Sequence, residues 1–581
     1  MSGSALFPIG LPPGLILLAG ALLLPFVPRT ARGWAFLVFP VLAFLQVLAT
    51  PEGTSVAVPF LDFELEPLRA DRLSLVFGNI FALVTILGGV FALHLKDTGQ
   101  QVSALVYAGC ALGAVFAGDL LTLFVFWELM AFAAAYLVWA RRDPESYGAA
   151  ARYFFYHAVG GAVLMAGILW HVGETGSFAF SAFEGGWPTY LILLGFAVNA
   201  AVVPLHAWIA DAYPRGTITG SVFLSAFTTK TAVYALVRGF SGWEILLWAG
   251  VLMTIYGVTY AVLANDIRRI LSYHIVSQVG FMVAGIGVGT ELAINGSVSH
   301  AYTHILYKGL LFMATGAVIY ATGRSKLTEL GGLARAMPWT FAFYMVAALS
   351  ISSAPFFSGF ISKPMTISAA GYEGEGLAVL LLYLASVGTF LSVGLKLPWF
   401  TWMGEAKEPI EVRALPKGMM AAMAIGAALN IYLGVQPGPL YQILPFPVDY
   451  DTYTLTTLVK GFQILLFTGL AYALLLNVLK PKDRIQLDLD WLYRRPARAA
   501  FYAGPAALAH GFGTVERAVY AVVFALVRVG RDPVGSLRGA GKAVAPDQVA
   551  VSDSGTFRVT MTAMVAVLLL TLGVLSALVI F

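Results

Sequence analysis

Three ionisable side chains recur on one predicted helix of this sequence. His300, His304 and Lys308 lie in VSHAYTHILYKGLLFMATG. Their i, i+4, i+8 spacing places them within about 80° of one helix face and over about 12 Å of rise. Because an imidazole can donate at one nitrogen and accept at the other, this stripe can pass a proton between hydrated partners. Two histidines four residues apart also fit zinc, but no acidic or cysteine ligand accompanies them, so we predict no metal site.

Four further charged residues lie in or beside strongly apolar segments. Glu128 is in LLTLFVFWELMAFAAAYLVW, Lys230 in SVFLSAFTTKTAVYALV, Lys363 after the kink-prone SSAPFFSGFIS, and Lys396 in GTFLSVGLKLPWF. A charge near the centre of a bilayer costs several kcal/mol, so each residue needs a reason to be there. Glu128 and Lys230 are far from the predicted helix ends, which favours function. Lys396 has an alternative, in which its side chain extends to the membrane interface.

Two other polar residues have structural alternatives. His206, in VVPLHAW, is either a functional group or a side chain that satisfies backbone groups freed by Pro204. Asp119 lies at a span boundary, which favours a residue that starts a helix over a member of a proton path.

The amino-acid composition indicates whether water or lipid surrounds these helices. Of the 581 residues, 59% are hydrophobic and 11% are charged, against about 25% charged in ordinary soluble domains. Lipid must therefore surround most of the chain. This excludes a soluble enzyme, a nucleic-acid-binding protein and a disordered protein. The single cysteine, Cys110, excludes a disulfide framework and a thiolate metal cluster.

Apolar windows of membrane-spanning length predict an all-α polytopic membrane protein. About 16 windows qualify, and they are continuous apolar runs, which excludes a transmembrane barrel. Basic residues follow the odd-numbered spans and acidic residues mainly follow the even-numbered ones. The positive-inside rule then places the N-terminus outside and the basic loops in the cytoplasm.

The C-terminal region departs from this pattern. Residues 481–556 hold no convincing span, and 497–529 are apolar but interrupted by charges, which predicts an amphipathic helix along the membrane. Four prolines in this region, Pro496, Pro505, Pro533 and Pro546, favour several shorter helices over one long helix. Residues 557–581 are predicted to form a last span.

Prolines also indicate broken helices at two places in the core. Pro204 falls inside the seventh span, and Pro355 and Pro364 fall within or at the end of the twelfth. Spans 4–8 and 9–13 each contain five helices, and an odd number of helices gives two repeats opposite orientations. Broken helices at corresponding places are typical of inverted-repeat transporters.

Long motifs in order resemble one family. DLLTLFVFWELM, VVPLHAWIADAYPRGTITGSVFLSAFTTKTAVYAL, NDIRRILSYHIVSQVGFM, HAYTHILYKGLLFMATG and SAPFFSGFISK are similar to the antiporter-like proton-translocating subunits of complex I, membrane-bound hydrogenases and Mrp sodium/proton antiporters. The resemblance covers about residues 100–445. It implies a core of about 14 helices with two inverted five-helix repeats and a charged, hydrated axis at mid-membrane.

The resemblance also assigns roles to residues. Glu128 matches the glutamate of the fifth span, Lys230 the residue that links the half-channels, and His300, His304 and Lys308 the central relay. Lys363 matches the exit position. Asn199 stands where the family usually has a lysine, which puts the usual glutamate–lysine pair in doubt. DLDWLYRRP, GRDPVGSLRGAGK and GTFRVTMTAMV resemble the tail of the largest complex I antiporter-like subunit, a lateral helix anchored by a last span.

These observations predict a division of the chain into six parts. They are N-terminal transmembrane helices at 1–101, a first repeat unit at 102–264, a second repeat unit at 265–403, C-terminal core helices at 404–480, a cytoplasmic-side lateral segment at 481–556 and an anchoring helix at 557–581.

The leading functional hypothesis is a proton-conducting subunit of a multi-subunit membrane complex. We expect an Mrp-type cation/proton antiporter component similar to the D subunit of those antiporters, with Na⁺ as the candidate coupling ion. The alternatives are a proton-pumping subunit of a complex I-like oxidoreductase or membrane-bound hydrogenase, and a proton-coupling subunit for inorganic-carbon uptake. No cofactor or redox site is expected in the chain itself. The expected partners are other membrane subunits, contacted partly through 481–581, in a bacterial or archaeal inner membrane.

Overall fold

The structure is a computed structural model that describes residues 10–483 and 487–531. The chain divides between Asp490 and Trp491 into two units. The first unit contains a bundle of helices, and the second contains the long helix α21 (Arg498–Arg531). The predicted last span, 557–581, lies outside the described residues.

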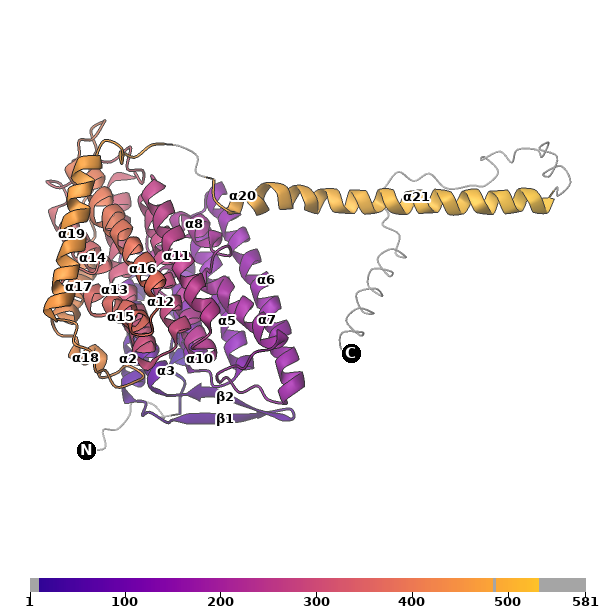
Figure 1. Cartoon of the computed structure of the whole chain (residues 1–581), viewed down its shortest axis with the longest axis horizontal. Helices are drawn as coiled ribbons and strands as arrows, with labels where there is room; N and C mark the ends of the chain where they lie inside the picture. Colours follow the sequence, from indigo (N-terminus) through magenta and orange to yellow (C-terminus); the bar gives the residue numbers. More distant parts are fainter. Residues whose placement is uncertain (1–9, 484–486, 532–581) are drawn as a thin grey trace. The chain divides into compact units, whose positions relative to one another are not determined.

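Helices account for most of the first unit (Figure 1). In chain order the helices that precede the middle of the bundle are α1 (Pro13–Leu23), α2 (Arg32–Ala49), α3 (Arg72–Phe91), α4 (Thr98–Phe116), α5 (Leu120–Trp139), α6 (Pro144–Thr175), α7 (Trp187–Ala200), α8 (Ala207–Ala212), α9 (Gly220–Leu224) and α10 (Thr228–Phe240). They are followed by α11 (Glu244–Leu263), α12 (Ile267–Val288), α13 (Glu291–Thr322), α14 (Pro338–Ile351), α15 (Lys363–Tyr372), α16 (Gly376–Thr389), α17 (Lys417–Val435), α18 (Gly438–Tyr441), α19 (Leu455–Leu475) and α20 (Asp490–Leu492). Two wide-pitched π segments, Phe390–Lys396 and Trp399–Met403, extend α16.

The helices agree with the predicted spans. Among the described residues, twelve helices are long and apolar enough to cross a membrane, and three shorter apolar helices accompany them. Each corresponds to one predicted window before residue 481. The all-α polytopic membrane fold is therefore confirmed.

Three spans are interrupted near their middle. The chain leaves helical geometry between α7 and α8, around Pro204, and between α14 and α15, around Pro355, as the prolines predict. A third break separates α9 from α10, where the sequence holds no proline and predicts an unbroken span. Non-helical backbone at membrane depth persists only where protein or water satisfies it. These breaks therefore mark polar places inside the bundle.

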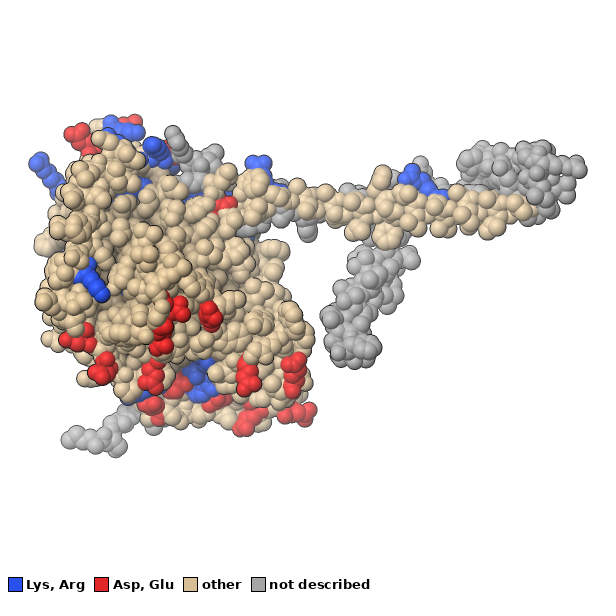
Figure 2. Space-filling view, viewed as in Figure 1, with Lys and Arg blue, Asp and Glu red and all other residues tan. Residues whose placement is uncertain are grey.

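Opposite charges collect at opposite ends of the bundle. Figure 2 shows Asp and Glu gathered at the end that carries β1 (Ser55–Phe60) and β2 (Phe63–Arg69), with most Lys and Arg at the other end. The two strands form an antiparallel hairpin in which Ser55 pairs with Arg69 and Phe60 with Phe63. This separation is the structural counterpart of the alternating loops in the sequence.

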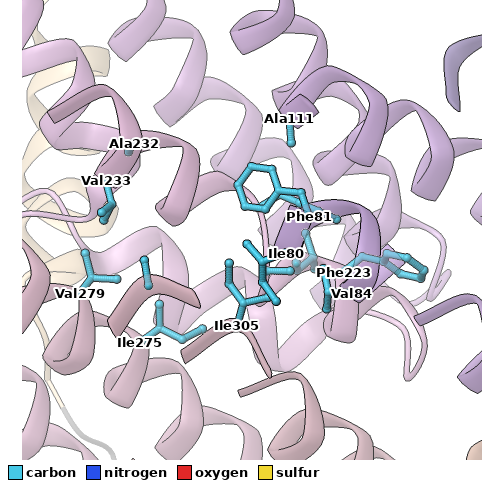
Figure 3. Packing of buried hydrophobic residues seen from close by; sticks show 14 of the residues in the cluster. Ile80, Phe81, Val84, Ala111, Phe223, Ala232, Val233, Ile275, Val279 and Ile305 are labelled. Atoms are coloured by element: carbon cyan, nitrogen blue, oxygen red, sulfur yellow. The ribbon is translucent and has the colours of Figure 1, made fainter. Parts of the chain in front are cut away.

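Apolar side chains seal the interior between the broken helices. Figure 3 shows Ile80, Phe81 and Val84 of α3 packed among side chains from α9, α10, α12 and α13, including Phe223, Val233, Ile275 and Ile305. Polar groups on the same helices are thus enclosed in protein and shielded from lipid.

The helix α21 corrects one prediction. It runs from Arg498 to Arg531 as one helix with Pro505 inside it, so the expectation of several shorter helices is wrong for this stretch. A proline removes only its own N–H donor and strains the preceding turn. Here that single defect falls at the eighth residue of the helix, in its third turn, and the regular hydrogen bonds of the following residues continue the helix.

Candidate functional site

The centre of α13 holds two ionisable groups without partners. The side chains of His304 and Lys308 are fully buried, and both imidazole nitrogens of His304 and the Nζ of Lys308 lack any hydrogen-bond partner among the described residues. The ring of Tyr307 packs edge-on to His304, with centroids 5.2 Å apart. A buried amine without a partner is costly, so this place requires water or an exchanging proton.

His300, one turn before His304, is by contrast fully engaged. Its Nδ1 lies 3.0 Å from the Ser362 hydroxyl and its Nε2 lies 3.2 Å from the Gln278 amide oxygen. The rings of His300 and His304 are 6.3 Å apart. The stripe predicted from the spacing therefore exists, and its first member connects α12 to the break before α15.

Lys230 lies at the unexpected break between α9 and α10. Its Nζ donates to the backbone oxygen of Ser225 at 2.7 Å and to the Thr229 hydroxyl at 3.0 Å. Because the helix is broken here, the Ser225 carbonyl is free of the helical hydrogen-bond pattern and can accept the hydrogen bond from the lysine. Lys230 interacts electrostatically with Lys308, so the two amines belong to one charged interior.

Lys363 occupies the equivalent place at the break between α14 and α15. Its Nζ donates to the backbone oxygen of Ile351 at 2.8 Å and lies 4.8 Å from the centre of the Phe281 ring. The ring face stabilises a cation there. Two lysines, each bonded to a carbonyl freed by a broken helix, thus flank the unpartnered pair on α13.

A cavity leads away from Lys363. A space of about 50 Å³ is lined by Lys363, Ser352, Ser386 and Lys460. It shares Lys460 and other lining residues with a larger depression of about 470 Å³, which also contains Asp449. The polar lining continues from Lys363, the residue that matches the exit position, toward Asp449 at the acidic end of the bundle.

His274 is a member of the interior that the sequence analysis missed. It is fully buried on α12, and its Nε2 lies 2.6 Å from the Ser392 hydroxyl. It interacts electrostatically with both Lys308 and Lys363, so it belongs to the same charged interior. The signal was present in LSYHIVSQ, where His274 and Gln278 are four residues apart in an apolar span.

Lys396 belongs to a different environment. Its Nζ donates to the backbone oxygens of Val262 at 2.5 Å and Ala264 at 3.1 Å, and the residue is only 3% exposed. Its amine therefore lies against the backbone at the end of a helix of membrane-spanning length. It caps the C-terminal end of α11, where free carbonyls attract a cation.

Glu128 lies against α6. Its Oε1 is buried without a hydrogen-bond partner among the described residues, and it lies close to Gly161, where a side chain would collide with it. The side-chain amide of Asn199 is likewise buried without a hydrogen-bond partner in the described part of the chain. The structure thus supplies no hydrogen-bond partner for Oε1 of this glutamate within the described chain.

Hydroxyl groups connect α6 to the Lys230 helix. The Thr228 hydroxyl lies 2.6 Å from that of Tyr107 and 3.1 Å from that of Tyr153. The ring of His157 stacks on Tyr153 at 4.0 Å. These residues extend the polar interior from Lys230 toward α6, the helix that contacts Glu128. No motif in the sequence indicated that they belong to this interior.

The break between α7 and α8 holds a further unexpected pair. His206 Nε2 lies 3.4 Å from Oδ1 of Asp488, which also accepts a bond from the Tyr256 hydroxyl at 2.5 Å. The alternative in which His206 bonds freed backbone groups is wrong. Asp119, as expected, starts a helix, because its carboxylate accepts the Thr122 N–H at the beginning of α5.

Comparison with known proteins identifies the family. Residues 117–392 match the family described as NADH:quinone oxidoreductase/Mrp antiporter, TM. The D subunit of the Na(+)/H(+) antiporter of Alkalihalophilus pseudofirmus is 30% identical over 352 residues, which cover 57% of this chain and 71% of the relative. The chain belongs to this family.

Other relatives share the same core. The A subunit of the Na(+)/H(+) antiporter of Alkalihalophilus pseudofirmus is 29% identical over 73% of this chain, and the chain spans 61% of that relative's length. Hydrogenase-4 component B of Escherichia coli is 26% identical over 79% of this chain and 75% of the relative.

Solved structures agree on the fold. A chain of the Mrp complex from Dietzia aligns with a TM-score of 0.69 at 23% identity, over 78% of this chain and 99% of that one. A chain of an archaeal membrane-bound sulfane sulfur reductase aligns with the same score and identity, over 97% of this chain and 99% of that one. This family's antiporter-like membrane fold is therefore present here.

Proposed function

We propose that this chain translocates protons along the polar interior between its broken helices. The proposed order is Lys230, His304, Lys308, His274 and Lys363, with His300 beside the path. The observation that carries the proposal is the unpartnered, fully buried pair His304 and Lys308 between two lysines that are bonded to carbonyls. A purely structural interior would satisfy these groups.

The mechanism is electrostatic. Two ammonium groups in a medium of low dielectric repel each other, so a proton that arrives at Lys230 favours release of a proton from Lys308. The same repulsion operates toward Lys363 through His274. Water in the cavity beside Lys363 then accepts the proton on the acidic side of the bundle.

Glu128 is the proposed proton acceptor at the start of the path. Its partly buried carboxylate has an oxygen with no partner in the described chain, so a neighbouring subunit or water supplies one. We place Lys396 in the second half of the protein as a residue that secures helix α11 beside the path.

The chain acts as one subunit of a multi-subunit complex. We favour cation/proton antiport with a role like that of the antiporter D subunit, because the chain covers 71% of that relative's length. The second candidate is coupling to a redox partner, favoured by a sulfane sulfur reductase chain that aligns over 97% of this chain. We also propose that the chain has the six parts predicted from the sequence. It would lie in the inner membrane, with its N-terminus outside.

The helix α21 is the proposed brace between subunits. It has 34 residues with an apolar and a polar face, and many of its apolar side chains, such as Leu508, Val515 and Leu526, are exposed. An amphipathic helix of this length binds along the membrane or along neighbouring subunits.

Substitutions of Lys308 test the proposal. Proton flux should be measured in vesicles that contain the assembled complex, with Lys308→Ala and Lys308→Arg. Arginine keeps the charge but does not release its proton, so both variants should lose most of the flux. Lys407→Ala, in an exposed loop, is the control and should transport normally. Normal flux in an assembled Lys308→Arg complex would overturn proton exchange at this residue.

A further inference from the structure

A second polar cavity lies at the basic end of the bundle, away from the proposed path. It has a volume of about 570 Å³ and is lined by residues from six separate segments: the loop after α3, the start of α4, the ends of α5 and α13, the loop before α9 and the start of α12. Its charged lining residues are all cations or a histidine: Lys96, Arg141, Arg268 and His94.

Arg268 is the residue that requires an explanation. It is 2% exposed, and its guanidinium donates through Nη1 to the backbone oxygen of Gly216 at 2.9 Å. Its Nε and Nη2 are buried without a partner among the described residues. A buried guanidinium with two unused nitrogens is strongly unfavourable unless an anion completes its hydrogen bonds.

The neighbouring carboxylates do not supply that anion. Asp266 accepts the backbone N–H groups of Arg268 and Arg269 at the start of α12 and makes no side-chain bond to Arg268 in the described structure. Asp143 binds Arg141 at 2.8 Å and does not line the cavity. The cavity therefore keeps an excess of positive charge around Arg268 and Lys96.

Arg268 lies beside Gly316 of α13, where a methyl group would be 3.5 Å from Nη2, in ordinary van der Waals contact. Leu95 and Ile319 form an apolar wall, while Thr217 and Thr219 add hydroxyl groups to the lining. A cavity with clustered cations, hydroxyls and one apolar side suits a phosphate group that is attached to an apolar body.

We propose that this cavity binds a phosphoryl anion, held by Arg268 and Lys96, and that an anionic phospholipid headgroup supplies it. The apolar wall favours the lipid over free phosphate, because the glycerol and upper acyl chains would cover it. The basic end is the end that the positive-inside rule assigns to the cytoplasmic leaflet, where anionic lipids bind basic pockets between helices. The site is independent of the residues in the proposed proton path.

Native mass spectrometry of the assembled complex tests this site. The complex should be released from nanodiscs of phosphatidylcholine with and without phosphatidylglycerol, and retained phosphatidylglycerol should be counted. Arg268→Gln should lower its retention by about tenfold, and Lys96→Gln by about fivefold. Arg335→Gln removes an exposed cation outside the cavity and should leave retention unchanged.

A second measurement separates the two sources of the anion. Inorganic phosphate is added to the lipid-stripped complex, and the shift in thermal unfolding is compared between the native chain and the variants. A shift that depends on Arg268 shows that soluble phosphate also fills the site, whereas lipid retention without this shift assigns the site to the headgroup. If Arg268→Gln does not assemble, Lys96→Gln decides. Lipid retention and phosphate shifts that are both unchanged by the variants would overturn the proposal.

Discussion

Asp488 Oδ1 lies 3.4 Å from His206 Nε2, and both side chains are almost completely buried. The two hydroxyl groups of Tyr256 and Tyr273 donate to the same carboxylate at 2.5 Å each. Asp488 is two residues before α20 and ten before α21, whereas His206 lies at the break between α7 and α8. The segment that leads to α21 is therefore fastened directly to the helix that is broken between α7 and α8.

Removing the charge of Asp488 should loosen this attachment. Asp488→Asn keeps the size of the side chain but weakens hydrogen bonds to a charged group, which contribute about 1.5–3 kcal/mol each. Hydrogen exchange in a peptide that covers residues 487–492 should become about ten- to a hundredfold faster. Asp483→Asn is the matched control, because its exposed pair with Lys326 at 3.1 Å contributes little. Equal exchange rates in the two variants would contradict a special role for Asp488.

The attachment should also persist into acid. Burial by itself raises the pKa of the Asp488 carboxyl, but the contacts with His206, Tyr256 and Tyr273 hold that pKa well below its usual value of 3.8. Because the folded-state pKa is depressed, the stabilisation is complete above the unfolded value and is lost only as the pH falls through the folded-state pKa. Exchange of residues 487–492 should therefore be independent of protonation at this carboxyl from neutral pH down to about 5. A protection step near neutral pH that Asp488→Asn abolishes would contradict this assignment.

Apolar length and charge patterning were enough to predict the spans, and prolines predicted two of the three breaks. Prolines marked the breaks beside His206 and Lys363, but the break before Lys230 has none, and its signal is only the cluster of small and hydroxyl residues in SAFTT. The three-residue stripe on α13 followed from helical spacing alone. Asp488 could not be predicted as a partner of His206, because pairing across distant segments is decided by tertiary packing.

The sequence also did not predict the hydrogen-bond partners of the buried polar groups. Spacing placed His300 and His304 on one face, yet only the packing of Ser362 and Gln278 makes one engaged and the other free among the described residues. Lys396 illustrates the same point, since its position near a helix end fitted either the interface or the path. Two carbonyls at the end of α11 decide its surroundings.

Gly161 offers a way to move Glu128 without replacing it. A methyl group at Gly161 would collide with the Glu128 carboxylate, which is the mobile end of its side chain. Gly161→Ala should therefore displace the carboxylate and lower proton flux by roughly tenfold, as expected for 1–3 kcal/mol of overpacking. Gly173→Ala lies on the same helix with open space around it, so it has the same change in helix propensity and should keep full flux. Equal flux in the two variants would remove Glu128 from the path.

The sidedness of the bundle can be tested within the described residues. Lys407 and Glu373 are exposed in loops that the charge pattern assigns to opposite sides. In a Cys110→Ala background, Lys407→Cys should react with an impermeant maleimide only from the cytoplasm and Glu373→Cys only from outside. Labelling of both from one side would refute the proposed topology.

Substitutions of Lys396 can distinguish a positioning role for this residue from a role in proton exchange. Its amine satisfies two carbonyls at the end of α11, and leaving buried carbonyls unpaired costs about 1–3 kcal/mol each. Lys396→Met should therefore lower the thermal stability of the assembled complex and reduce flux in proportion. Lys396→Arg retains donors for the same carbonyls, so it should recover most of both. An arginine variant that is stable but transports no protons would instead place Lys396 on the path, because a guanidinium at that position bonds the carbonyls but does not release a proton.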